Sequence, residues 1–228
     1  MNKPTRSVTE TSTMKRSIFS VAIIGAILVA GCNTLERSRS LSDTAVPAVA
    51  IAQQVCSNCH GAGGNAESPN FPNLAAQQET YFIAQLKGFR NHGRSDPAGF
   101  EYMWGLSKHL TDEQIAGLAT YYARQTPTPT WLGARNTSAN LQGRKIFEEG
   151  IASSSVPACK ACHGAEAKGL ATFPRLAGQH ADYVVKQLMV FQRTDERPEG
   201  GVMKSIAHLL TSADMEAVAS YVEALPSK

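Results

Sequence analysis

The feature that most constrains this chain of 228 residues is a Cys-x-x-Cys-His pattern that occurs twice, at residues 56–60 and 159–163. Two cysteines three positions apart lie on one side of a helical turn, where both can reach the vinyl groups of one porphyrin. The histidine that follows is placed to bind the iron, so the pattern is the attachment signature of a c-type haem. We therefore predict two haem c groups. The residues expected to hold them are Cys56, Cys59 and His60, and then Cys159, Cys162 and His163.

Other uses of paired cysteines fit this sequence less well. A thioredoxin-like redox pair lies in a βαβ unit, and no alternating strand pattern flanks either pair. A structural zinc site joins two Cys-x-x-Cys pairs about 15–20 residues apart, whereas Cys59 and Cys159 are separated by a much longer stretch. Haem attachment is therefore the preferred interpretation.

The repetition extends well beyond the cysteine pairs. The segment Phe-Pro-Asn-Leu-Ala-Ala-Gln at 71–77 recurs as Phe-Pro-Arg-Leu-Ala-Gly-Gln at 173–179. Further matches follow in the same order: Tyr81 with Tyr183, Gln85-Leu86 with Gln187-Leu188, Phe89 with Phe191, Met103 with Met203, and Leu110-Thr111 with Leu210-Thr211. Such self-similarity predicts two homologous domains.

The domain limits follow from this repeat. We expect the first domain at 46–126, the second at 138–228, and a linker at 127–137 that starts with Pro-Thr-Pro-Thr. Because proline cannot continue a helix and restricts the residue before it, the linker is expected to be extended. Residues 33–45 are polar and aperiodic, and we interpret them as a tether in front of the first domain.

The hydrophobic pattern predicts an all-α fold, without period-two strands. Thr111 and Thr211 each precede a polar side chain by three positions, which is the pattern of a capping box at the start of each domain's last helix. The other expected helices cover residues 45–55, 78–89, 140–149 and 180–192.

The N-terminus carries an export signal. Lys15 and Arg16 precede an apolar run at 18–30, which is shorter than the about 20 residues of a membrane-spanning helix. The pattern predicts a signal peptide over residues 1–32 and a bacterial periplasmic location. The run ends in Leu-Val-Ala-Gly-Cys, which is similar to a lipobox, so we expect a lipid anchor on Cys32. Cleavage without lipidation is the alternative.

Charge and cysteine content agree with these assignments. The formal net charge of +3 lies in the predicted leader, and the rest of the chain is balanced. A nucleic-acid-binding surface needs clustered basic residues, so no nucleic-acid partner is expected. One lipidation site and two haems account for all five cysteines, which leaves none for a disulfide.

Each iron needs a sixth ligand or an open position. Met103 and Met203 occupy equivalent places before the last helix of each repeat. A methionine thioether raises the reduction potential of a haem, and we predict that both residues are axial ligands. The alternative is packing in the core, which is the role expected of Met189 and Met215 because neither has a methionine counterpart in the first repeat.

Pro72 and Pro174 follow the two motif histidines at nearly equal distances. Each proline carbonyl is expected to accept a hydrogen bond from histidine Nδ1–H, which would orient the ring and tune its basicity. A plain turn is the alternative. Arg94 and Arg197 are interpreted either as partners of haem propionates or as solvated loop charges. The histidines expected at the surface or beside the ligands are His92, His109, His180 and His208.

The full pattern resembles the di-haem cytochrome c4 family over roughly residues 46–225. Each C-x-x-C-H-G segment is followed by F-P-x-L-A-x-Q, Y-x-x-x-Q-L-x-x-F, a methionine and a short final helix. The resemblance implies two tandem class I cytochrome c domains related by a pseudo-twofold axis, with the haem propionate edges facing each other. It also implies ligand pairs His60 with Met103 and His163 with Met203. The lipobox is not general in that family.

The functional hypothesis is an electron carrier without catalytic activity, which relays electrons between respiratory complexes, for example towards a terminal oxidase. Its expected partners are redox proteins, and the membrane through the lipid anchor. Two alternatives remain: the cytochrome subunit of a periplasmic dehydrogenase, and a di-haem peroxidase. A peroxidase needs an open or displaceable iron position, which a methionine in both repeats disfavours.

Overall fold

The computed structural model describes residues 40–97, 99–129 and 138–226, which fold into helices without an extended strand. The first half contains α2 (Ala48–Ile51), η1 (Ala52–Cys56), α3 (Ser57–His60), η2 (Ala62–Gly64), α4 (Glu79–Arg90), η3 (Gly99–Met103), α5 (Trp104–Ser107) and α6 (Asp112–Ala123). The second half contains α7 (Ser138–Glu149), η4 (Ala152–Ser154), α8 (Lys160–His163), α9 (Ala181–Arg193), η5 (Pro198–Gly200), α10 (Gly201–Ala207) and α11 (Ser212–Ala224). The all-α prediction is confirmed. The predicted signal peptide, Cys32 and most of the linker lie outside the described residues.

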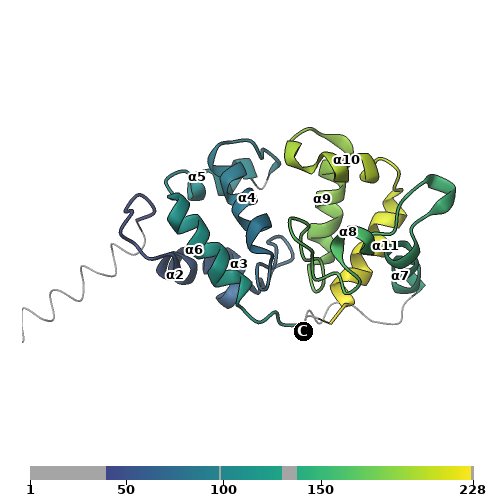
Figure 1. Ribbon diagram of the computed structural model, residues 1–228, viewed down its shortest axis with the longest axis horizontal. Helices are drawn as coiled ribbons and strands as arrows, with labels where there is room; N and C mark the ends of the chain where they lie inside the picture. Colours follow the sequence, from purple (N-terminus) through teal and green to yellow (C-terminus); the bar gives the residue numbers. More distant parts are fainter. Residues whose placement is uncertain (1–39, 98, 130–137, 227–228) are drawn as a thin grey trace, which may run out of the picture.

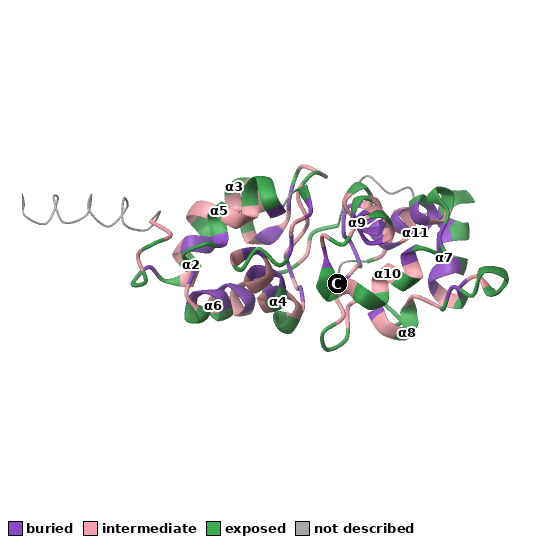
Figure 2. Cartoon of the chain, turned by 90° about the horizontal axis from the view of Figure 1, so that it is seen from above, coloured by how far each residue is buried: buried purple, intermediate pink, exposed green. Residues whose placement is uncertain are grey.

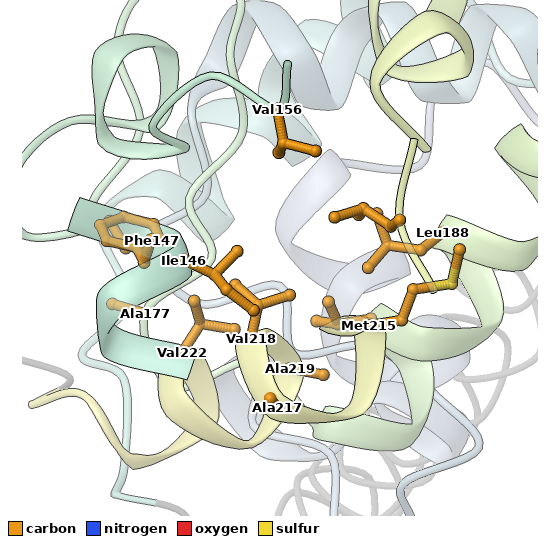
Figure 3. Close-up of a cluster of buried hydrophobic side chains, with 13 residues drawn as sticks. Ile146, Phe147, Val156, Ala177, Leu188, Met215, Ala217, Val218, Ala219 and Val222 are labelled. Carbon is orange, nitrogen blue, oxygen red and sulfur yellow. The ribbon is translucent and has the colours of Figure 1, made fainter. Parts of the chain in front are cut away.

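Each half has its own hydrophobic core, and the two halves lie side by side (Figure 1). The first core runs from Val46 to Tyr122, and the second runs from Ile146 to Val222, where α7, α9 and α11 meet (Figure 3). Buried residues lie inside each half and also where the halves meet (Figure 2). None of the described helices is long and apolar enough to cross a membrane.

The capping boxes predicted for the last helices are present. The Thr111 side chain accepts a hydrogen bond from the Gln114 backbone N–H, and the Gln114 side chain accepts one from the Thr111 backbone N–H. Thr211 and Asp214 make the same pair of bonds at the start of α11. Each box satisfies backbone donors that the first helical turn leaves free, so these two helices begin at equivalent positions.

The helix that leads to each cysteine pair differs between the domains. In the first domain α2, η1 and α3 run on without a break to His60, so the expected end at residue 55 is wrong. In the second domain α7 stops before Gly150, which has a φ of +80°. A loop closed by a bridge between Ile151 and Val156 then separates α7 from α8. The reason lies in the sequence, because residues 48–60 contain no glycine or proline and residues 150–157 contain both.

The first and last helices of the second domain cross in close contact at Gly143. A Cβ atom at this position would lie 2.0 Å from the carbonyl oxygen of Ala217 on α11. In the first domain the corresponding glycine, Gly117, lies on the last helix, α6. A Cβ atom at Gly117 would lie 2.6 Å from the Cβ of Ala48 on α2. Glycine at either crossing lets the two backbones approach.

Two buried arginines connect the domains, and Arg94 is the first. Its guanidinium donates to the Asp96 carboxylate at 2.7 Å and to Gln85 Oε1 at 2.7 Å within its own domain. It also donates to Gln187 Oε1 of the second domain at 3.1 Å, and it lies over the Phe89 ring. Asp96 is completely buried, so the guanidinium compensates a carboxylate that has lost its water.

Arg197 makes the equivalent set of contacts from the second domain. It donates to Glu199 at 3.0 Å and to Gln187 Oε1 at 2.6 Å within its own domain, and to Gln85 Oε1 of the first domain at 2.8 Å. Its guanidinium lies over the ring of Phe191. Both arginines are buried. The interpretation as solvated loop charges is therefore wrong, because the pairing of two domains removes these side chains from water.

His180 also lies at the domain interface. The residue is 2% exposed, its Nε2 donates to the Ala66 carbonyl oxygen of the first domain at 3.0 Å, and its Nδ1 is 3.6 Å from Glu223 Oε1. The expectation of a surface position is wrong for this histidine. Its counterpart Gln78 donates from Nε2 to the Lys168 carbonyl oxygen at 2.8 Å, so the second domain alone has a titratable group at this contact.

We predict that Gly143→Ala destabilises the protein by about 1–3 kcal/mol, the usual cost of overpacking a tight contact. The added methyl group would collide with the backbone of α11 and force the helices apart. Thermal or denaturant unfolding of the haem-loaded protein measures the change. Gly201→Ala is the matched control, since nothing lies within 4 Å of a Cβ at that helical position. Equal stability of the two variants would contradict the predicted crossing.

We predict that His180 makes the stability of the protein depend on pH. The Glu223 carboxylate raises the pKa of His180 above its usual value, with smaller contributions from the Ala66 carbonyl and Asp182. The charged imidazole therefore stabilises the folded state fully below the pKa of an unfolded histidine, and this contribution is lost as the pH rises through the folded pKa. Unfolding free energies between about pH 5.5 and pH 9 should fall more in the wild type than in His180→Gln. The same slope in both proteins would contradict this assignment.

Candidate functional site

The first Cys-x-x-Cys-His motif lies on the last turns of the first helix. His60 ends α3, and its Nδ1 is 2.9 Å from the carbonyl oxygen of Pro72. Because a carbonyl can only accept, Nδ1 carries the proton and Nε2 is left with a lone pair. The edge of the Phe71 ring packs on the imidazole, with the ring centroids 6.1 Å apart. The Phe-Pro segment thus contacts the histidine twice.

The second motif repeats this geometry closely. His163 ends α8, its Nδ1 is 3.0 Å from the carbonyl oxygen of Pro174, and the Phe173 ring lies at 6.2 Å between centroids. No other hydrogen bond links either imidazole to a residue in the described part of the chain. Burial lowers the pKa of both His60 and His163, so both rings are neutral at physiological pH and suited to bind a metal.

None of the four motif cysteines forms a disulfide. Burial raises the pKa of Cys56 and of Cys159 to about 11, so both are uncharged. The described residues contain no group of three or more His, Cys, Asp or Glu side chains that is arranged to hold a bare metal ion.

The predicted methionine ligands lie in equivalent segments. Met103 ends η3 and Met203 lies on α10. Each is partly buried and packs against the hydrophobic core of its own domain, as does the first cysteine of that domain's motif, Cys56 or Cys159. The structure therefore brings a thioether and a motif cysteine to one apolar region in each domain. Met215 is fully buried in the second core, in agreement with its expected packing role.

These residues fit a haem in each domain. The thiols of Cys56 and Cys59, or of Cys159 and Cys162, would form the thioether bonds. The free Nε2 of the neutral histidine would bind the iron on one side, and the methionine of the same core is the candidate ligand on the other. The axial roles of Met103 and Met203 stay predictions.

Reasoning from the sequence missed the function of the repeated glutamines. Gln77 and Gln179 end the Phe-Pro-x-Leu-Ala-x-Gln segments, and both are buried at the domain interface. Each side chain bonds to the backbone of the other domain's segment, at Arg175 and at Asn73 respectively. The sequence signal that could have indicated a shared role was the recurrence of glutamine at the same place in both repeats. Because the partner lies about 100 residues away in the sequence, spacing could not identify it.

Comparison with known families assigns both halves to cytochromes. Residues 141–226 match the family model described as cytochrome c, and residues 44–121 match the model of subunit III of cbb3-type cytochrome c oxidase. The two matches are consistent with one haem c in each domain, as predicted from the motifs.

Relatives of similar length support the same conclusion. The chain is 38% identical to cytochrome c4 of Pseudomonas aeruginosa over 75% of this chain and 84% of that protein. The structure of cytochrome c4 from Acidithiobacillus ferrooxidans superimposes with a TM-score of 0.69 at 37% identity, covering 75% of this chain and 98% of that one. A thiosulfate dehydrogenase electron acceptor of Thiomonas intermedia is 31% identical, over 92% of each chain. The chain therefore belongs to the cytochrome c4 family of di-haem electron carriers.

Proposed function

We propose that this protein is a periplasmic electron relay with two six-coordinate His/Met haems, anchored by lipid to a membrane. The observation that carries the proposal is the equivalence of the two sites. Each domain has a neutral histidine held by a proline carbonyl and a methionine packed on the same core as the motif cysteine. The first domain has the same histidine, proline and methionine as the second, so neither domain is marked as the one with an open, catalytic iron.

The roles of the chain's own residues follow from this arrangement. Each haem, when bound, supplies a one-electron Fe(II)/Fe(III) couple. The proline carbonyl holds the histidine ring in one orientation and one tautomer. The packed methionine would serve as the second protein ligand of the iron, and the core around it would limit rearrangement between oxidation states. A site built in this way passes electrons without binding a substrate.

The alternative of a permanent dehydrogenase subunit has one observation in its favour. The similarity to a thiosulfate dehydrogenase electron acceptor extends over 92% of both chains. Such a protein would use the same two haem sites with a dedicated donor. Purification from detergent-solubilised membranes distinguishes the cases, because a subunit remains bound to its dehydrogenase in a fixed ratio and a free carrier does not.

We predict that carbon monoxide leaves the visible spectrum of the reduced wild-type protein unchanged, because both irons are closed by protein ligands. Met103→Ala and Met203→Ala should each open one iron, so that each variant binds CO at one of its two haems. Met189→Ala is the control, and it should remain closed. CO binding by the wild type would contradict the relay and favour the peroxidase alternative. A Met→Ala variant that still excludes CO would remove that methionine from the ligand set.

We predict that Cys32→Ala abolishes incorporation of labelled fatty acid and releases the haem-loaded protein from the membrane fraction, because the sulfur of Cys32 is the proposed site of the lipid. Asn33→Ala, one residue further on, should remain labelled. A Cys32→Ala protein that still carries label would contradict the lipobox interpretation and leave an ordinary export signal.

A further inference from the structure

We propose that each domain tunes the haem of the other domain, through a hydrogen-bond chain that passes through a single peptide group. Gln179 of the second domain acts on His60 of the first, and Gln77 of the first acts on His163 of the second. Both glutamines are positioning residues, since they act through the histidine. The inference rests on the proposed function in so far as it takes these two histidines as haem ligands.

The chain that ends at His60 is made of three groups. The Nδ1–H of His60 donates to the carbonyl oxygen of Pro72 at 2.9 Å. That carbonyl and the N–H of Asn73 belong to the same peptide group, and this N–H donates to Oε1 of Gln179 at 2.8 Å. Nε2 of Gln179 donates back to the Asn73 carbonyl oxygen at 2.9 Å. The glutamine amide is therefore fixed at both ends.

The second chain is the pseudo-twofold copy of the first. The Nδ1–H of His163 donates to the Pro174 carbonyl oxygen at 3.0 Å, and the N–H of Arg175 in the same peptide group donates to Oε1 of Gln77 at 2.7 Å. Nε2 of Gln77 donates to the Arg175 carbonyl oxygen at 3.2 Å. The same arrangement therefore runs in both directions across the domain interface.

The physical effect follows from the polarisation of a peptide. When a peptide N–H donates a hydrogen bond, its carbonyl oxygen becomes more negative and accepts a stronger one. A stronger bond from Nδ1–H makes the histidine a more basic ligand, which stabilises Fe(III) and lowers the reduction potential. Both glutamines are buried, so each peptide N–H is bonded to the other domain rather than to bulk water. Losing one glutamine bond should therefore raise the potential of the haem in the other domain.

The loops that carry the two prolines are held in the same crossed way. Nε2 of His180 donates to Ala66 in the first domain, and Nε2 of Gln78 donates to Lys168 in the second. The Thr80 hydroxyl donates to the Ala171 carbonyl oxygen at 2.7 Å. Thr80 thus crosses the same interface without reaching the Pro174–Arg175 peptide, which makes it a suitable control.

Gln179→Met and Gln77→Met test the proposal, because methionine preserves side-chain length and removes both hydrogen bonds to the other domain, together with the one that each glutamine accepts from the backbone N–H of the next residue. The midpoint potential of each haem is measured by NMR. The Nδ1–H signal of each motif histidine is also recorded by NMR, in the reduced, diamagnetic holoprotein. Gln179→Met should raise the potential of the first-domain haem and shift the signal of His60 only. Gln77→Met should do the same for the second-domain haem and His163. Thr80→Val should change neither potential.

Three results would overturn the proposal: a shift confined to the haem of the mutated domain, equal shifts at both haems, or no shift. If Gln179→Met does not fold, Gln179→Glu replaces the acceptor of the Asn73 N–H by a stronger one. The potential of the first-domain haem should then fall, and the Nδ1–H signal of His60 should move to lower field. An unchanged or raised potential of that haem would contradict the chain. Failure of the proposed function is separate, since it is detected by CO binding to the wild type.

Discussion

The reciprocal pairing of a glutamine side chain with the backbone of the other domain is the constraint on which the arrangement of the two halves depends. Gln179 holds the residue after Pro72, and Gln77 holds the residue after Pro174. These prolines orient the motif histidines, so the contact that joins the domains also reaches the haem ligands. Domain association and ligand orientation are thus parts of one hydrogen-bonded structure.

The pseudo-twofold symmetry holds at this centre and weakens away from it. Both domains have the same Gln–backbone and Arg–Gln contacts across the interface. The carboxylate that pairs with Arg94 is completely buried, whereas Glu199 beside Arg197 is partly exposed. His180 with Glu223 occurs in the second domain alone. The two motif histidines therefore have equivalent hydrogen-bond partners within unequal electrostatic surroundings.

The geometry is compatible with the electron-carrier function of the cytochrome c4 family. Both motif histidines are neutral and held by one bond at Nδ1, and both methionine segments pack on an apolar core. Rigid ligands reduce the rearrangement that accompanies electron transfer, and buried sites keep water from the iron. The same properties serve a free carrier and a dehydrogenase subunit, so partner binding rather than haem chemistry separates these two functions.

The sequence by itself determined the cofactor type, the two domains, the all-α class and the caps at Thr111 and Thr211, because each depends on residues close together in the chain. It predicted the Pro72 and Pro174 carbonyls for the same reason, as each lies a short loop away from its histidine. Only the tertiary structure decided that Arg94, Arg197 and His180 are buried, and that Gln77 and Gln179 reach the opposite domain. These contacts join residues about 100 positions apart, and a local pattern carries no information about which distant backbone a polar side chain will meet.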